Sequence, residues 1–466
     1  MNDRLKIILR FVLLVLAGSL IGFSPRAISV TENARKVQLA FAAENYSAGA
    51  DLLIKMAEEN PWWVSLWESA GNAAYLGGDF ITAGSSYEKA LELSALSVEG
   101  QIKLGRTYLQ LGEGENAAEI WLGLEGSDIA LEELAVLHEE NGEITKAIEA
   151  WHQYLTQSEE GNRPELIYHF GLLMAADAPP RALPYLDQVR EDFPQTEGIA
   201  AAIRGAISEE PAYQYVTAGQ ALAAIGEWNL AAYAFERAVV LRRDYQEAWL
   251  YLGEALQHLE EPRDDVLETL ETGLVLDEES PLANLFLGLY WQRQGSHLTA
   301  LEYFQIVEEL WPENPDIRVE AGKSLAAVGE LESALVKYQE ASELAPLDRS
   351  YYNQLAEFCV LYAYQVKEIG LPASRIAVQL DPTDAESLDI LGQVLLALDD
   401  KLNAVKLFQQ ALENDPAYAP AHFHLGIYYS AVDDIDRTVY HLQQVLLHTD
   451  NPALYDQAQR LLANYQ

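Results

Sequence analysis

The chain contains a single cysteine, Cys359, among its 466 residues. One cysteine excludes an intramolecular disulfide, so covalent cross-links do not hold this protein together. Cys359 lies on a predicted helix face with Tyr352 and Leu355, which predicts a buried structural thiol and not a reactive one. No cysteine occurs near the N-terminus, and this excludes a bacterial-type lipoprotein anchor there.

Basic residues are also scarce. The sequence has 30 Lys and Arg residues against 72 Asp and Glu residues, which gives a formal net charge of -42 at pH 7. Proteins bind nucleic acids largely through Lys and Arg side chains that neutralise phosphates, so this charge argues strongly against a nucleic-acid partner. Two interpretations of the acidic excess stay open: it keeps a large helical surface soluble, or it forms a surface that selects a basic partner.

Motifs for catalysis and for ligand binding are absent from the sequence. There is no phosphate-binding glycine-rich loop, and no Ser, His and Asp set at a nucleophile elbow. His422 and His424 stand two residues apart on a predicted helix, so they point to nearly opposite sides, and His441 and His448 follow further along. This spacing does not converge on a metal ion. We therefore expect no enzymatic activity, no cofactor and no metal site.

The one long hydrophobic run is close to the N-terminus, over residues 11–23, and it follows Arg4, Lys6 and Arg10. A basic region followed by an apolar run is the layout of a secretory signal. The segment 1–29 is therefore predicted to be either an uncleaved signal-anchor helix or a cleaved signal peptide. The rest of the chain is expected on the extracytoplasmic side of a membrane, or secreted if the segment is cleaved.

A regular recurrence of small residues runs through the remainder of the chain. Glycines return at steps that are mostly 34 residues or close to it, at Gly71, Gly105, Gly171, Gly219, Gly253, Gly288, Gly322, Gly392 and Gly426. Twelve residues after most of them stands an alanine, and four residues further a bulky side chain, as in Ala404 and Phe408 after Gly392. A fixed period of this size indicates an array of structural repeats.

Helix packing explains these columns. A glycine on a first helix lets a second helix approach closely, and the alanine and the bulky residue one turn later form the matching face of that second helix. Glycine inside a helix costs about 1 kcal/mol relative to alanine, so its recurrence needs a steric reason. Pro312, Pro346 and Pro416 end second helices and lead the chain into the next repeat.

These residues resemble the tetratricopeptide repeat family. The segment from Ala385 to Tyr418 matches its signature best, at Leu388, Leu391, Gly392, Leu395, Ala404, Phe408, Ala411 and Pro416. The resemblance covers nearly all of the chain after the first 30 residues. It implies an all-α fold, a right-handed α-α superhelix with a concave groove that binds peptides or proteins, here preceded by one N-terminal hydrophobic helix.

Departures from the period divide the array. The step between Gly171 and Gly219 is longer than the others, which predicts an extra helix or a discontinuity at 195–211. The repeats are then predicted to occupy segments 30–194 and 212–451. After them, residues 452–466 predict a helix that caps the open end of the array.

Two repeats depart from the pattern internally. The unit after Gly253 lacks the alanine and aromatic columns, which predicts a shifted or loosened second helix. The unit that contains Ala356 is expected to be irregular from Tyr362 to Leu371, where a second helix would otherwise begin.

The resemblance also implies which residues line the groove. In the family they lie six and three positions before the glycine and one and four positions after it, and here they are mostly acidic. They are Glu68, Asn72, Glu99, Arg106, Glu132, Glu139, Glu247, Glu254, Asp316, Lys323, Glu357, Asp389 and Gln393, with Glu165 and Glu386 at equivalent positions. Only Arg106 and Lys323 oppose the acids, so this groove is expected to prefer a basic segment.

The functional prediction is a non-catalytic scaffold or adaptor, membrane-anchored or exported, that binds a protein or peptide segment in its groove. The alternative, by analogy with other members of the family, is an accessory subunit of envelope polysaccharide synthesis or export. The sequence leaves open the identity of the partner and the oligomeric state.

Overall fold

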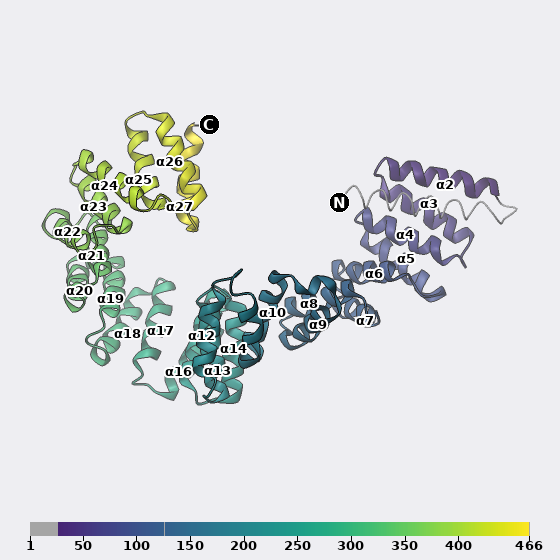
Figure 1. Ribbon diagram of the computed structural model, residues 1–466, viewed down its shortest axis with the longest axis horizontal. Helices are drawn as coiled ribbons and strands as arrows, with labels where there is room; N and C mark the ends of the chain where they lie inside the picture. The colour runs from purple at the N-terminus through teal and green to yellow at the C-terminus, as the bar shows by residue number, and fades with distance from the viewer. Residues whose placement is uncertain (1–26, 125, 466) are drawn as a thin grey trace. The chain divides into compact units, whose positions relative to one another are not determined.

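The computed structural model describes residues 27–124 and 126–465, and the regular elements in these ranges are helices, without a strand. The predicted all-α fold is therefore confirmed (Figure 1). The predicted N-terminal hydrophobic helix falls within residues 1–26 and so lies outside the described residues. Of the helices that are described, none is both long and apolar enough to cross a membrane.

Contacts between helices divide the chain into two units, the first ending at Ala234 and the second beginning at Phe235. The first unit is built from consecutive helices that pack as pairs. They are α2 (Ala27–Ala42), α3 (Tyr46–Glu59), α4 (Val64–Leu76), α5 (Phe80–Leu93), α6 (Val98–Gln110), α7 (Gly114–Leu122), α8 (Asp128–Glu140), α9 (Ile144–Gln157), η1 (Glu159–Asn162), α10 (Pro164–Asp177), α11 (Pro179–Gln188), α12 (Thr196–Ala206), α13 (Pro211–Ala223) and the start of α14 (Trp228–Leu241).

The second unit contains the end of α14 and the helices after it. They are α15 (Gln246–His258), α16 (Arg263–Leu276), α17 (Pro281–Arg293), α18 (His297–Leu310), α19 (Pro315–Ala327), α20 (Leu331–Leu344), α21 (Arg349–Leu361), the π-helical turn η2 (Val366–Gly370), α22 (Leu371–Leu380), α23 (Ala385–Ala397), α24 (Lys401–Asn414), α25 (Ala419–Ala431), α26 (Ile435–His448), α27 (Pro452–Leu462) and η3 (Ala463–Tyr465).

At the recurring glycines, the first helix of a pair packs directly against an aromatic ring of the second helix. A Cβ atom added at Gly392 of α23 would lie 2.5 Å from the ring of Phe408 in α24, and one added at Gly288 would lie 2.6 Å from Phe304. Both rings are fully buried. Close packing at glycine, as expected from the sequence, is thus confirmed at these pairs.

Part of the acidic charge is used to start helices. Asp79, Asp384, Asp400 and Asp434 are N-cap residues, and each accepts a hydrogen bond from a backbone N–H of the helix that it precedes. Such caps stabilise a helix start by about 1 kcal/mol. These aspartates are therefore structural, and their charge is not available as a free recognition surface.

The predictions for the two irregular repeats had different outcomes. The expected loosening after Gly253 is wrong, because α16 is a regular helix whose fully buried Leu270 replaces the aromatic residue against this glycine. The helix is only shifted: it begins ten residues after Gly253, whereas α18 begins nine residues after Gly288.

The expected irregularity after Ala356 is confirmed. Ala363 and Gln365 have positive φ angles of 48° and 52°, and the π-helical turn η2 then leads into α22, which has only 10 residues. Cys359 is fully buried next to this turn, and burial raises the pKa of its thiol to about 11. The cysteine is structural, as predicted.

Two further helices fall where the sequence analysis expected helix. Helix α12 occupies Thr196–Ala206, and α27 packs onto α26 with Ala458 and Leu462 buried. The predicted segment boundaries themselves stay predictions, since the division by contacts falls within α14.

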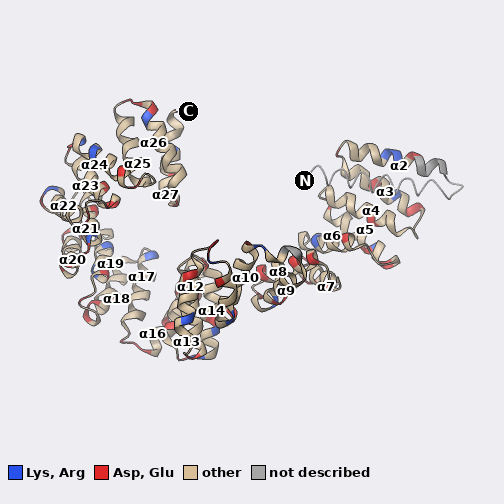
Figure 2. Cartoon of the chain, viewed as in Figure 1, with Lys and Arg blue, Asp and Glu red and all other residues tan. Residues whose placement is uncertain are grey.

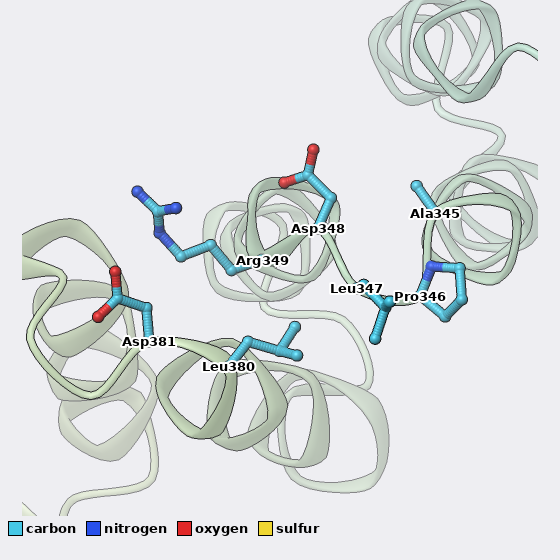
Figure 3. A pocket seen from close by; sticks show the side chains of 7 residues that line it. All are labelled: Ala345, Pro346, Leu347, Asp348, Arg349, Leu380 and Asp381. Carbon is cyan, nitrogen blue, oxygen red and sulfur yellow. The ribbon is translucent and has the colours of Figure 1, made fainter.

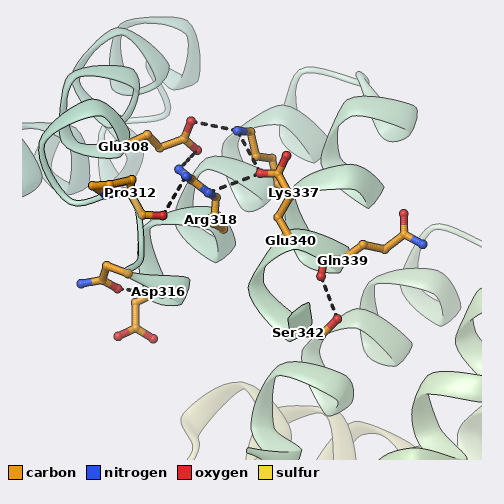
Figure 4. A network of polar contacts seen from close by, with 9 residues as sticks. Glu308, Pro312, Asp316, Arg318, Lys337, Gln339, Glu340 and Ser342 are labelled. Atoms are coloured by element: carbon orange, nitrogen blue, oxygen red, sulfur yellow. Dashed lines mark hydrogen bonds and ion pairs between the residues drawn. The ribbon is translucent and has the colours of Figure 1, made fainter. Parts of the chain in front are cut away.

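A polar network ties three successive helices of the second unit together (Figure 4). Arg318 of α19 forms ion pairs with Glu308 of α18 at 3.0 Å and with Glu340 of α20 at 3.3 Å, and it donates to the carbonyl of Pro312 at 3.1 Å. Lys337 of α20 contacts Glu308 at 2.8 Å. The opposite charges in this network compensate one another through ion pairs, which is the usual condition for burying charged groups.

Candidate functional site

The residues predicted to line the groove lie on the first helices of the pairs, on α4, α6, α8, α15, α19, α21 and α23. We call the side of the first helices that carries these residues the groove face. Figure 2 marks the Asp and Glu positions in red and the Lys and Arg positions in blue along the described helices. Several residues of the groove face, however, are bonded to the next repeat along the chain.

The first bonds of this kind join α4 to α6. Glu68 accepts hydrogen bonds from the hydroxyl group and the backbone N–H of Ser97. The Asn72 Oδ1 atom accepts from Lys103 Nζ at 2.8 Å and from the Tyr87 hydroxyl group at 3.0 Å. Lys103 is a groove-face cation that the sequence analysis did not identify.

The pattern continues along the first unit. Lys103 also contacts Glu99 at 2.7 Å, and Arg106 donates to Glu133 of α8 at 2.6 Å. Glu139 of α8 pairs with His169 of α10 at 2.9 Å. Of the predicted residues in this unit, Glu132 and Glu165 are exposed without a hydrogen bond or ion pair to another described residue.

In the second unit, Glu254 of α15 accepts two hydrogen bonds from the Arg293 guanidinium of α17, at 2.7 and 2.8 Å. Asp316 of α19 accepts from the Tyr351 hydroxyl group of α21 at 2.8 Å. Lys323 pairs within its own helix with Glu320 at 2.8 Å.

Asp389 of α23 is the most buried acid of the groove face, with 1% of its side chain exposed. One carboxylate oxygen lies 2.8 Å from His424 Nδ1 of α25, and the other accepts from Gln393 Nε2 at 2.9 Å. Asp389 and Gln393 were predicted to line the groove, whereas His424 was expected to be a satisfied histidine. The bonds explain how a buried carboxylate is stabilised.

Glu357 of α21 and Glu386 of α23 differ from these paired acids. Both are exposed to solvent, and neither forms an ion pair with any residue that the structure describes. Surrounding protein nevertheless desolvates them, and this raises the pKa of both carboxyl groups. The charge of Asp389 further raises the pKa of Glu357, and Lys323 opposes this effect. The charges of Asp384 and Glu357 further raise the pKa of Glu386, which Arg349 and a hydrogen bond with Asn353 lower in part. We call Glu357, Glu386 and Asp389 the α21–α23 acidic face.

Two polar residues that the sequence analysis did not name border this face. Tyr418 precedes α25, and its pKa is raised by burial and by the charges of Asp389 and Glu386. Asn353 of α21 is buried and donates to the Ser387 hydroxyl group at 3.0 Å, while its Oδ1 atom has no partner among the described residues. The face is therefore rich in acceptors.

Glu247 of α15 is exposed and, like Glu132, has no hydrogen bond or ion pair to another described residue. Glu132 and Glu247 therefore provide matched comparisons for Glu357 and Glu386.

Two of the C-terminal histidines, His422 and His441, are bonded to each other. His422 is buried, its Nε2 atom lies 3.1 Å from the Pro416 carbonyl oxygen, and its Nδ1 atom lies 2.9 Å from His441 Nδ1. Burial lowers the pKa of both imidazoles, that of His441 to about 4. In the described part of the chain, no three His, Cys, Asp or Glu side chains come together as a metal site would require.

A pocket of about 690 Å³ lies at the turn between α20 and α21. Figure 3 shows Leu347 of the turn and Leu380 of α22 bordering it, with Arg349 and Asp381 on one side. Arg349 is engaged by Asp384 at 2.9 Å, and Asp381 accepts a hydrogen bond from the Thr383 backbone at 3.0 Å. The polar side chains that line this pocket therefore bond to residues of the adjoining turns.

Comparison with known proteins agrees with the paired helices and their glycines. The family profile of the tetratricopeptide repeat matches residues 385–418. The chain is a tetratricopeptide repeat protein. The profile covers α23, α24 and the turn that follows, so the α21–α23 acidic face lies partly on a tetratricopeptide repeat.

Two curated relatives and one solved structure resemble this tetratricopeptide repeat protein. The peroxisomal targeting signal receptor of Candida albicans is 29% identical over 209 residues, which are 42% of this chain and 34% of the receptor. The TPR repeat-containing protein YpiA of Bacillus subtilis is 24% identical over 215 residues, 39% of this chain and 51% of that protein. The structure of yeast Tom70 aligns with 92% of this chain and 94% of its own, with a TM-score of 0.46 and 14% identity.

Proposed function

We propose that this protein is a non-catalytic adaptor and that its α21–α23 acidic face binds a segment of another protein through Lys or Arg side chains. The observation that carries the proposal is the state of Glu357 and Glu386, which are partly desolvated, close to other carboxylates and outside any ion pair with a described residue. Like charges held together in this way destabilise the free protein. A bound ammonium or guanidinium group would relieve that repulsion.

The surroundings of these glutamates support a donor-rich ligand. Asp389 and the unpartnered Oδ1 atom of Asn353 are further acceptors. The two cations whose charges reach these glutamates are already paired, Lys323 with Glu320 and Arg349 with Asp384. A side chain that carries several N–H donors and a positive charge complements such a set.

The relatives are consistent with this proposal. The Candida albicans relative is by its name a receptor for a targeting signal. The match spans a third of that receptor, so its activity is carried over only as part of the proposal. No observation on the described residues favours the polysaccharide alternative, which stays a prediction.

The test measures binding of a fluorescein-labelled peptide that alternates Lys with Ser and Gly, by anisotropy on the full-length protein. The variant Glu357→Gln with Glu386→Gln is expected to bind about tenfold more weakly, and binding to the natural protein should weaken as salt rises. The control variant is Glu132→Gln with Glu247→Gln, which removes the same charge from other exposed positions of the groove face.

Equal affinity of the two double variants would contradict the proposal, because general attraction to an acidic protein would then explain binding. A peptide with Gln in place of Lys should bind to none of the three proteins. Retained binding of that peptide would show that the cationic side chains are not the recognised feature.

Localisation forms a second part of the proposal: the protein is exported, or tethered to a membrane, through the segment 1–29. The support is the apolar run behind Arg4, Lys6 and Arg10. Cell fractionation with N-terminal sequencing of the mature protein distinguishes an anchor from a cleaved peptide. Recovery of uncleaved protein in the cytosolic fraction would contradict both.

A further inference from the structure

A second candidate surface lies in the first unit, on helices that the groove-face residues do not explain. A pocket of about 630 Å³ is bordered by α7 on one side and α9 on the other, and α8 forms its floor. We call it the α7–α9 pocket. Its floor includes the buried side chains of Leu134 and Leu137, and its α9 wall includes the buried Ala150. Leu122, at the end of α7, borders the pocket with 66% of its surface exposed.

The length of α7 contributes to the pocket. Helix α7 has 9 residues, whereas the second helices on either side of it, α5 and α9, have 14 each. A helix five residues shorter is about 7 Å shorter, so α7 leaves part of the floor uncovered. The lining of α8 extends from Leu131 to Asn141, a length of about 15 Å, which corresponds to about ten residues of a guest helix.

The rim of the pocket is acidic. Its two basic side chains, His138 and Lys146, both contact Glu143, each at 2.6 Å. Three other glutamates, Glu115 and Glu119 on α7 and Glu149 on α9, remain without an ion pair to any described residue. The pocket thus combines an apolar floor with uncompensated negative charge on both walls.

We propose that the α7–α9 pocket binds an amphipathic helix of another protein, whose apolar side chains enter between α7 and α9 and whose flanking Lys or Arg side chains meet Glu115, Glu119 and Glu149. A helix fits because ridges of side chains on one helix pack into the groove between two others, with apolar anchors one turn apart. Because the rim is acidic, charge complementarity requires a partner that carries positive charge. This surface is separate from the α21–α23 acidic face and does not depend on it.

The experiment uses the full-length protein and a labelled amphipathic peptide with leucines at positions i, i+4 and i+7 between flanking lysines. Affinity is measured by anisotropy, and a photoreactive benzoylphenylalanine in the peptide locates its site by mass spectrometry. The expected cross-links fall within residues 114–153. An analogue with Gln for Lys is expected to bind about tenfold more weakly.

Two variants disrupt the pocket in different ways. Ala118→Trp fills it from the wall of α7, and the triple variant Glu115→Lys, Glu119→Lys and Glu149→Lys reverses its rim. Each is expected to weaken binding about tenfold or more. The matched control carries Glu92→Lys, Glu332→Lys and Glu413→Lys, exposed positions on other second helices, and changes the net charge equally. Circular dichroism confirms that each variant is folded.

Weaker binding in both pocket variants, with the control unchanged within twofold, supports the proposal. Unchanged affinity in the two pocket variants overturns it, as do cross-links on α21 or α23, which would assign the peptide to the acidic face instead. Sedimentation equilibrium provides the remaining outcome. A dimer of the natural protein that is lost in Ala118→Trp would show that a second copy of the chain occupies the pocket, and this too would overturn the proposal.

Discussion

Two parts of the groove face carry similar residue types but use them differently. Along α4, α6, α8 and α10, the acids Glu68, Glu99 and Glu139 are each bonded to a neighbouring side chain. On α21 and α23, Glu357 and Glu386 keep their charges unpaired in a partly desolvated setting. Side chains that bond to the next repeat stabilise the array, whereas unpaired ones remain available to a ligand.

The comparison shows that counting charges along a predicted groove is not sufficient. A net charge of -42 suggests an acidic surface everywhere, yet caps such as Asp384 and pairs such as Glu254 with Arg293 use many of the carboxylates locally. In the proposal, the recognition surface consists of the acids that lack an ion pair and are partly desolvated. The variants below test this distinction, beginning with the largest expected effect.

Substitution Gly392→Ala tests whether the glycines hold the first helices in place to present the groove face. The added Cβ atom would lie 2.5 Å from the buried ring of Phe408, so unfolding by urea should require about 2 kcal/mol less free energy. Gly205→Ala in α12 is the control, since nothing lies within 4 Å of its added Cβ atom. It should raise stability by up to about 1 kcal/mol. Equal effects of the two substitutions would refute close packing as the reason for the glycine.

Substitution Asp389→Ala tests the structural character of a paired acid. Removal of this buried carboxylate leaves His424 and Gln393 without their acceptor, so we expect a loss of about 1–3 kcal/mol in urea unfolding. Asp389→Asn keeps an acceptor oxygen and should lose less. If the alanine variant were as stable as the natural protein, Asp389 would belong with the unpaired acids.

Substitution Arg106→Ala measures an exposed pair of the first unit. The side chains of Arg106 and Glu133 are 42% and 21% exposed, so solvent screens their attraction. The expected loss in free energy of unfolding is below about 1 kcal/mol, and it should shrink further in high salt. A loss above this value would mean that the first unit depends on its ion pairs more than the comparison assumes.

The double substitution Glu357→Gln and Glu386→Gln should slightly stabilise the protein at neutral pH, by a few tenths of a kcal/mol, because both groups are exposed and screened. Their folded-state pKa values lie above the ordinary value of 4.5. Protonation therefore favours the folded state below that value, and this contribution is lost as pH rises through the raised pKa values. The natural protein should approach the variant in stability as pH falls, as followed by thermal unfolding. A growing difference toward low pH would contradict the pKa directions.

Much of the fold could be predicted from the sequence because glycine and aromatic residues at a fixed spacing report one repeated packing contact, such as that of Gly288 with Phe304. Helix α16 was harder to predict, since Leu270 makes the same contact one residue later without an aromatic ring. A pattern that specifies residue type detects the common solution and overlooks an aliphatic one of similar size.

The site was less predictable for a different reason. Partners such as Lys103 for Asn72, or His424 for Asp389, lie about one repeat further along, at separations of 31 and 35 residues. A search for complementary residues at that spacing could have found them. The desolvation of Glu357 and Glu386, in contrast, is caused by the protein that surrounds them. The spacing of residues in the sequence does not report desolvation.

The most direct test of the central claim is the number of protons released when the Lys-containing peptide binds. Calorimetric titration near pH 5 in buffers of different ionisation enthalpy measures this number, because a cation beside Glu357 and Glu386 lowers their raised pKa values. We predict proton release by the natural protein and almost none by the variant with Glu357→Gln and Glu386→Gln. Equal release by the two proteins would contradict the account and place the bound peptide elsewhere on the chain.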